Sequence, residues 1–124
     1  MCVSGKFIIS VIDDDESFRT ALVGLLRSLG YEAQGFTSAV EFINSGDEGS
    51  CDCIITDFCM PKMSGLDLIQ QLAARGSTVP VIMVTGRPEP GLEVKAAAVG
   101  AVCLLMKPFE ADALIDHLER ALRI

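Results

Sequence analysis

The sequence predicts a single α/β domain built around a parallel β-sheet. The length of 124 residues fits one domain. Stretches with the apolar pattern of strands alternate along the chain with stretches that have helical periodicity. Half of the residues are hydrophobic, which suffices for one core without disulfide bonds. We therefore expect residues 1–124 to form one domain, without an internal repeat or linker.

Five apolar stretches have the length and composition of β-strands. Residues 7–12 form a continuous apolar run with β-branched side chains, which is typical of a strand buried on both faces. Residues 79–84 give the strongest strand pattern, whereas residues 31–36 are more polar and predict a more exposed strand. The expected strands cover residues 7–12, 31–36, 53–56, 79–84 and 101–106.

A helical stretch follows each strand. Between residues 18 and 29 apolar side chains recur at i, i+3, i+4 and i+7, and Gly30 stands where helices commonly end on a glycine. Ser64 and Asp67 have the spacing of a capping box, in which the two residues satisfy backbone N–H groups at a helix start. The expected helices cover residues 18–29, 39–44, 65–74, 92–99 and 111–122.

Five consecutive βα units define the expected architecture. Strands that alternate with helices specify a parallel sheet covered on both faces, with right-handed crossovers. For five units we expect the flavodoxin-like (βα)5 doubly wound fold, with strand order 2-1-3-4-5.

The overall composition excludes several classes of function. Ten basic and seventeen acidic residues give a net charge of −7, which disfavours direct nucleic-acid binding. No apolar run approaches the ~20 residues of a membrane span. Residues 1–6 lack the pattern of a secretory signal, so we expect a cytoplasmic protein with no membrane partner.

The cysteines do not predict a metal or redox site. Their spacing lacks CxxC pairs, and His117 is the only histidine, so a zinc site is rejected. We expect reduced thiols, as in a reducing cytosol. The five cysteines are Cys2, Cys51, Cys53, Cys59 and Cys103.

Polar residues stand where four of the expected strands end. The carboxyl ends of parallel strands lie on one edge of a sheet, and the predicted strand order makes these four strands contiguous. Three carboxylates, a hydroxyl and an ammonium group are therefore expected to converge. The pairs and single residues concerned are Asp13 and Asp14, Asp57, Thr85 and Gly86, and Lys107 and Pro108.

Each of these residues also has a purely structural interpretation. An acidic run before a helix commonly caps free N–H groups, and we adopt that interpretation for Asp15 and Glu16. For Asp13 and Asp14 the sequence leaves capping and a functional site equally open. A single Asp after a strand is usually a turn residue. The coincidence at four strand ends is what favours a site.

The residue types predict phosphoryl-transfer chemistry. Clustered carboxylates repel one another, and a hard cation such as Mg²⁺ relieves that repulsion while retaining waters for a phosphate group. Lys107 adds a positive charge for phosphate oxygens. An Asp beside the metal can act as the nucleophile and form an acyl phosphate.

Four motifs in this order resemble the receiver domain of two-component response regulators, over essentially the whole chain. The stretch 79–109 looks most like the FixJ-type branch of that family, whose members often carry a C-terminal helix-turn-helix, a module that we do not expect within residues 1–124. The motifs are Val-Ile-Asp-Asp-Asp-Glu-Ser at 11–17, Thr-Asp-Phe-Cys-Met-Pro at 56–61 with Ser-Gly at 64–65, Val-Thr-Gly at 84–86, and Lys-Pro-Phe at 107–109.

The resemblance implies a phosphorylated aspartate and a magnesium site. Asp57 would accept the phosphoryl group from a sensor histidine kinase or a histidine phosphotransfer protein. Asp14 and Asp57 would ligate Mg²⁺ through their side chains, Cys59 through its backbone carbonyl, and Asp13 through water.

The resemblance also implies a switch. Lys107 would contact the phosphoryl group, and Thr85 would move its hydroxyl onto a phosphoryl oxygen, with the Gly86 N–H nearby. Pro108 would follow a cis peptide bond. The face made by the fourth helix, fifth strand and fifth helix would signal to a downstream output domain or protein. Such a domain is not an enzyme beyond its own phosphotransfer and dephosphorylation.

The sequence departs from the family pattern at several positions. Leu104 stands where many members carry Phe or Tyr, three residues before the lysine. Pro88 and Pro90 are expected to delay or shorten the fourth helix. Cys59 and Arg87 would lie near the pocket mouth and influence the lifetime of the phosphate.

Two other classes of function remain open. A phosphatase or hydrolase on this fold would usually need a second acid or base over the leaving group, and His117 is expected far from the strand ends. A degenerate receiver that only binds partners would not need the five polar residues named for the site.

Overall fold

The chain forms an α/β fold in a computed structural model that describes residues 7–46, 49–60, 62–87 and 89–122. Five parallel strands make one sheet in the order β2-β1-β3-β4-β5, which confirms the predicted doubly wound architecture. In order along the sheet they are β2 (Glu32–Phe36), β1 (Ile8–Ile12), β3 (Cys53–Asp57), β4 (Val81–Thr85) and β5 (Cys103–Met106).

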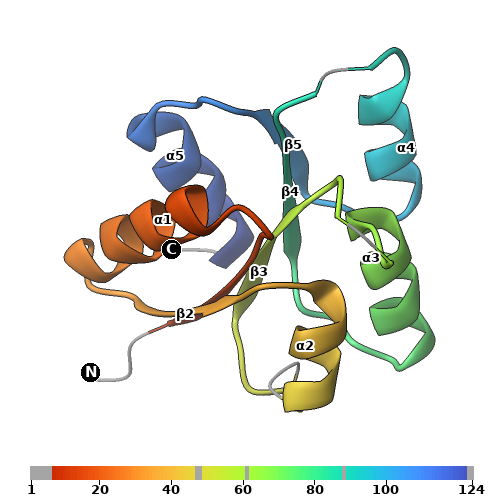
Figure 1. Ribbon diagram of the computed structural model, residues 1–124, viewed down its shortest axis with the longest axis horizontal. Coiled ribbons are helices and arrows are strands. Elements are labelled where there is room, and N and C mark those ends of the chain that lie inside the picture. The colour runs from red at the N-terminus through yellow and green to blue at the C-terminus, as the bar shows by residue number, and fades with distance from the viewer. Residues whose placement is uncertain (1–6, 47–48, 61, 88, 123–124) are drawn as a thin grey trace.

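Helices cover both faces of the sheet (Figure 1). The first face carries α1 (Glu16–Ser28) and α5 (Ala111–Leu122), and the core there includes Leu26 and Leu118. The second face carries α2 (Ala39–Ser45), α3 (Gly65–Ala74) and α4 (Leu92–Ala98). Its core includes Phe42 and Leu68, which are fully buried.

The central strands are apolar because both of their faces are covered. Every residue of β3 and of β4 is buried. Burial of whole strands on both faces is what parallel sheets require. By contrast β2 is an edge strand and is half exposed, as its polar composition predicts.

Two strands, β4 and β5, begin two residues later than the sequence predicts. Residues 79–80 precede β4 because Pro80 has no N–H for the ladder, although its carbonyl accepts a bond from Ile54 N. The Ala101 N–H donates to Ala96 O and closes the end of α4 beside Gly100, which has a φ of 98°. That turn uses the residues that an apolar pattern alone assigns to β5.

The predicted helix signals are present. Asp15 is the N-cap of α1, which begins two residues before the predicted stripe, and Gly30 follows the end of this helix with a φ of 96°. Ser64 and Asp67 form the capping box of α3. The short α4 begins after Gly91, as predicted from the prolines, of which Pro88 lies outside the described residues.

The described part of the chain carries no disulfide among its cysteines 51, 53, 59 and 103, while Cys2 lies outside it. Within the same residues, no helix has the length and apolar character needed to cross a membrane.

Candidate functional site

The sheet register brings the polar strand ends to one level. Ile12 of β1 is opposite Thr56 of β3, Asp57 is opposite Val84 of β4, and Thr85 is opposite Met106 of β5. The residues that follow each of these pairs therefore leave the sheet along the same edge. Residues that lie more than ninety positions apart in sequence meet there, as the strand order predicts.

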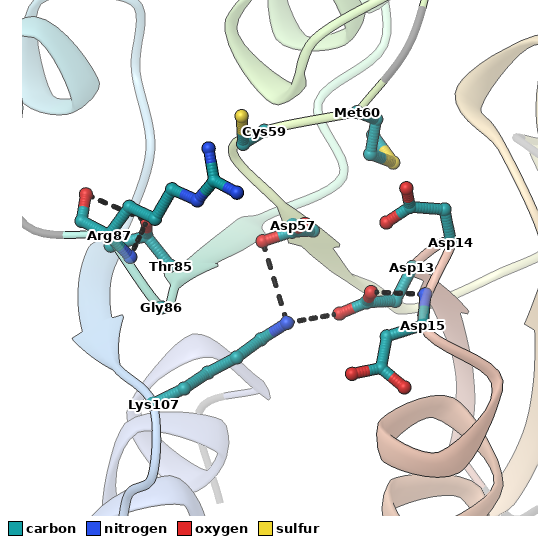
Figure 2. Close-up of a pocket in the computed structure, with 10 residues that line it drawn as sticks. All are labelled: Asp13, Asp14, Asp15, Asp57, Cys59, Met60, Thr85, Gly86, Arg87 and Lys107. Carbon is teal, nitrogen blue, oxygen red and sulfur yellow. Dashed lines mark hydrogen bonds and ion pairs between the residues drawn. The ribbon is translucent and has the colours of Figure 1, made fainter.

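An open cleft of about 570 Å³ lies at this edge, bounded by residues from the ends of four strands (Figure 2). It brings together the three carboxylates, the hydroxyl and the ammonium group that the sequence places at the strand ends, whereas Pro108 does not line it. Met60, to which the sequence analysis assigns no role, also contributes a wall and is buried. The lining residues are Asp13, Asp14, Asp15, Asp57, Cys59, Met60, Thr85, Gly86, Arg87 and Lys107.

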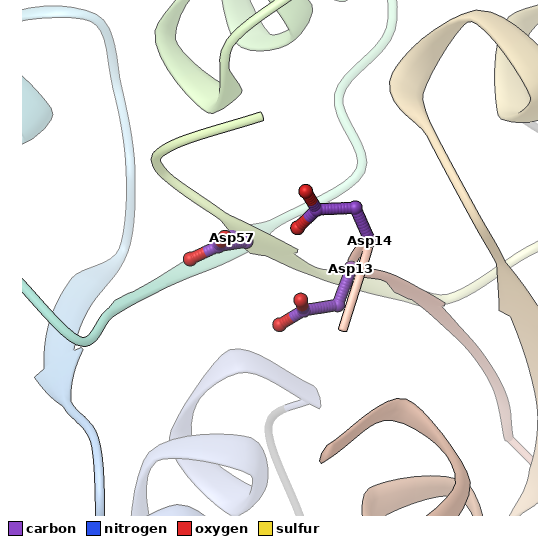
Figure 3. A group of neighbouring side chains, drawn as sticks. All are labelled: Asp13, Asp14 and Asp57. Carbon is purple, nitrogen blue, oxygen red and sulfur yellow. The ribbon is translucent and has the colours of Figure 1, made fainter. Parts of the chain in front are cut away.

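Three carboxylates form the acidic centre of the cleft (Figure 3). One oxygen from each of Asp13, Asp14 and Asp57 lies within 4.8 Å of the others. Burial, together with the charges of Asp13 and Asp14, raises the pKa of the Asp57 carboxyl to about 6 against the opposing effect of Lys107. The cluster therefore favours protonation of a carboxylate, or binding of a cation, over ionised carboxylates without a counter-ion.

Asp13 is fixed through both its side chain and its backbone. It is 1% exposed, and its Oδ1 accepts a hydrogen bond of 2.9 Å from the Asp15 N–H. The Arg19 guanidinium donates to its backbone carbonyl at 2.8 Å. Asp15 instead accepts from the Phe18 N–H at the start of α1, so the capping interpretation is right for Asp15. Asp14 is exposed and its carboxylate faces the other two (Figure 3).

Lys107 places a cation against the carboxylates of the cleft. Its Nζ lies 2.7 Å from Asp13 Oδ2 and 3.6 Å from Asp57 Oδ1 (Figure 2). Burial lowers the pKa of this amine, but the hydrogen bond and charge of Asp13, aided by Asp57, outweigh burial and leave the pKa above its usual value. The ammonium therefore bridges a buried carboxylate and the carboxylate that faces the open cleft. The peptide bond from Lys107 to Pro108 is cis, as expected.

Thr85 has its hydroxyl engaged in its own loop. The Arg87 N–H donates to Thr85 Oγ1 at 3.1 Å, and the hydroxyl donates to the Arg87 carbonyl at 3.3 Å. The hydroxyl is thus held beside the cleft by local bonds on the Arg87 side, not by the carboxylates (Figure 2). Local bonds of this kind are weak enough to be exchanged for a charged acceptor.

The donor chemistry of the cleft fits a magnesium ion. Carboxylate oxygens are the ligands that Mg²⁺ prefers, and one or two of them usually suffice. Asp14 and Asp57 present such oxygens from the ends of neighbouring strands, and these lie within 4.8 Å of each other. Cys59 is exposed and lines the same cleft.

Comparisons with known proteins all indicate the same family. Residues 9–119 match the family described as response regulator receiver domain. The chain is 38% identical to response regulator protein TodT of Pseudomonas putida over 117 residues, which is 94% of this chain and 52% of TodT. It is 40% identical to transcriptional regulatory protein FixJ of Azorhizobium caulinodans over 114 residues, which is 92% of this chain and 54% of FixJ.

Solved structures agree with the sequence relatives. The structure titled FixJ-N superposes with a TM-score of 0.86 at 30% identity, covering 97% of this chain and 96% of that one. The response regulator StyR gives a TM-score of 0.88 at 37% identity, covering 96% of this chain and 60% of StyR. The chain spans about half the length of the curated relatives it matches.

The fold and the cleft define a class of protein, a flavodoxin-like α/β domain with an acidic pocket and one lysine at the carboxyl edge of its sheet. Within that class, the chain belongs to the response regulator receiver domain family. Domains of this family act as phosphoacceptor switches in two-component systems, and their role is signalling rather than turnover of a substrate.

Proposed function

We propose that this domain is switched by phosphorylation of Asp57, with Mg²⁺ bound in the acidic cleft. The observation that carries the proposal is the position of the Lys107 ammonium, 3.6 Å from Asp57 Oδ1 and 2.7 Å from Asp13 Oδ2. A cation beside a carboxylate that lines an open cleft suits an oxygen that will carry a phosphoryl group.

The transfer itself needs positioning and charge neutralisation. A carboxylate oxygen of Asp57 attacks phosphorus, the bond from phosphorus to its donor breaks, and an acyl phosphate forms on Asp57. With acetyl phosphate as the donor, acetate leaves with the bonding electrons. Lys107 stabilises the negative charge on the phosphoryl oxygens.

The proposed metal ligands are the side chains of Asp14 and Asp57 and the backbone carbonyl of Cys59, with Asp13 acting through water. The acidic cluster supports this assignment because its oxygens lie within 4.8 Å of one another. When bound, the ion supplies positive charge for the incoming phosphate. The Asp57 carboxylate would then be held as an anion, because the cation offsets the burial that raises its pKa.

We propose that the conformational change begins at Thr85 and spreads to the surface formed by α4, β5 and α5. A phosphoryl group on Asp57 offers charged acceptors, and the Thr85 hydroxyl can exchange its 3.1 Å and 3.3 Å bonds with Arg87 for one of them. Gly86 lines the same cleft, so its N–H is proposed to lie near the phosphoryl group. The movement would free space beside Leu104 and alter the face formed by α4, β5 and α5.

The proposed partners follow from the family. A sensor histidine kinase or histidine phosphotransfer protein would supply the phosphoryl group, and an output domain or protein would respond. The relative FixJ is named a transcriptional regulatory protein, and about half of that relative lies beyond the matched region. The receiver domain itself is proposed not to contact nucleic acid, because its net charge is −7.

Incubation with acetyl phosphate and Mg²⁺ tests this function. Intact-protein mass spectrometry should show the addition of one phosphoryl group that is labile to base. Asp57→Asn should abolish the addition, whereas the matched control Asp112→Asn, in the exposed first turn of α5, should retain it. An unmodified wild type would support a receiver that only binds partners, and equal modification of Asp57→Asn would show that Asp57 is not the acceptor.

A further inference from the structure

An aromatic ring lies directly behind the cation of the cleft. The Nζ of Lys107 is 4.1 Å from the centroid of the Phe18 ring. Phe18 belongs to the first turn of α1, and its ring packs edge-to-face against Phe109, with centroids 5.8 Å apart and an interplanar angle of 85°. The ring is thus held between the start of α1 and the segment that follows Lys107. In the sequence Phe18 is only one member of an apolar helical stripe.

The ring changes the surroundings of the ammonium group. An ammonium has three N–H donors. Asp13 receives one at 2.7 Å, and Asp57 lies at 3.6 Å. The negative face of an aromatic ring attracts a cation at the distance seen here. Since the Lys107 side chain is only 17% exposed, the ring occupies a direction that water would otherwise take.

A lysine side chain needs such restraint to act at a defined point. Its four-carbon stem has many rotamers, and its ammonium is a strongly hydrated point charge. Without the ring, the ammonium could turn toward solvent or settle on Asp13 alone. An aliphatic side chain could fill much of the same space, but it has no negative face to hold a cation.

We propose that Phe18 is a positioning residue for phosphoryl transfer, whose ring holds the Lys107 ammonium within reach of oxygens on Asp57. This inference rests on the proposed function. It differs from a purely structural role for Phe18, in which the ring only packs beside the α1 and α5 core. The two roles are separable because only the first acts through the charge of Lys107.

The first test is geometric and does not depend on phosphorylation. In NMR spectra the ε-methylene protons of Lys107 should be shifted upfield by the ring current of Phe18. The shift should disappear in Phe18→Leu and persist in Phe18→Tyr, with Lys95, an exposed lysine of α4, as the internal reference. Ordinary random-coil shifts for Lys107 in the wild type would overturn the proposal.

The second test is kinetic. The rate of phosphorylation by acetyl phosphate at fixed Mg²⁺ should fall about three- to tenfold in Phe18→Leu and less than about twofold in Phe18→Tyr. In a Lys107→Gln background, Phe18→Leu should cause no further loss. An equal loss in both backgrounds would assign Phe18 a packing role and overturn the proposal.

Urea unfolding of each variant confirms that the fold is intact, and Phe18→Tyr retains a ring if Phe18→Leu is poorly folded. A ring-current shift in a wild type that is never phosphorylated would contradict the proposed function of Asp57, while the contact between Phe18 and Lys107 would stand. Failure of phosphorylation and failure of positioning therefore give different results.

Discussion

At the scale of single residues, the surroundings of the Asp57 carboxyl disfavour its negative charge. It is buried beside Asp13 and Asp14, and its pKa of about 6 lies above the ordinary 3.8. A group whose pKa rises on folding contributes stability that is complete below the unfolded pKa and is lost as the pH rises through the folded pKa. Ionised Asp57 therefore lowers the stability of the metal-free protein near neutral pH.

Asp57→Asn is expected to raise the free energy of unfolding of the metal-free protein. The gain should be about 1–2 kcal/mol at pH 8 and should shrink toward pH 4, where the wild-type carboxyl is protonated in the folded state. Urea titrations with a chelator across this range measure the difference. Asp112→Asn is the control, since that residue is exposed. A gain from Asp57→Asn that stays constant from pH 4 to pH 8 would contradict the assigned cause.

At the scale of elements, α3 approaches the end of β3 so closely that only glycine fits. A Cβ on Gly65 would lie 2.6 Å from the Asp57 carbonyl oxygen and 3.2 Å from Phe58 Cα. The Gly65 N–H also donates to the Phe58 carbonyl at 3.0 Å. The helix start and the loop after Asp57 are therefore locked together through backbone atoms, which cannot move aside as a side chain can.

Gly65→Ala should lower the free energy of unfolding by about 1–3 kcal/mol, because the added methyl group forces the two backbones apart. Gly24→Ala is a matched control in an exposed part of α1, where a Cβ meets nothing within 4 Å. That control should gain about 0.5–1 kcal/mol from helix propensity. Denaturant unfolding of both variants gives the comparison, and equal effects would show that the close approach does not matter.

At the scale of the whole molecule, the cleft links metal binding to folding. Three carboxylates with oxygens within 4.8 Å of each other come from the end of β3 and the residues that follow β1, so they converge only in the folded state. A ligand that binds only the folded form stabilises it by mass action. The charge repulsion that the cation relieves is present whenever the site is metal-free.

Mg²⁺ should raise the melting temperature of the wild type, and a concentration of about ten times Kd adds about 1.4 kcal/mol. Asp14→Ala should remove most of that gain and raise metal-free stability, because one of the clustered charges is gone. Thermal unfolding with and without Mg²⁺ measures both effects. Asp112→Ala should respond as the wild type does, and a wild type that is indifferent to Mg²⁺ would argue against the site.

Phosphorylation is expected to change the conformation of residues far from the cleft. A beryllofluoride mimic should change amide NMR shifts along residues 92–118 as well as in the cleft, and Thr85→Ala should suppress the distant changes. Leu104 is half-buried against the core near α4. It has neither the ring nor the hydroxyl group of a tyrosine. We therefore expect the conformations of the phosphorylated and unphosphorylated domain to be less sharply separated than they would be with Tyr at position 104. Shifts confined to the cleft would contradict a switch through Thr85.

The sequence by itself determined the elements, the strand order and the meeting of polar strand ends. The periodicity of apolar residues and the capping residues are local signals that predict each helix and strand. Because parallel strands end on one edge of the sheet, these elements then predict where the polar residues meet. That is why Asp13, Asp57, Thr85 and Lys107 were predicted together, and why the capping box at Ser64 could be recognised.

Only the tertiary structure decided how those side chains are partnered. It pairs Lys107 with Asp13 more closely than with Asp57, turns the Thr85 hydroxyl to Arg87, and places the Phe18 ring behind the ammonium. Each choice depends on rotamers selected by neighbours from other elements, and no local pattern in the chain records such contacts. The same reason explains why β4 and β5 begin where hydrogen bonds to other segments allow, and not where their apolar runs begin.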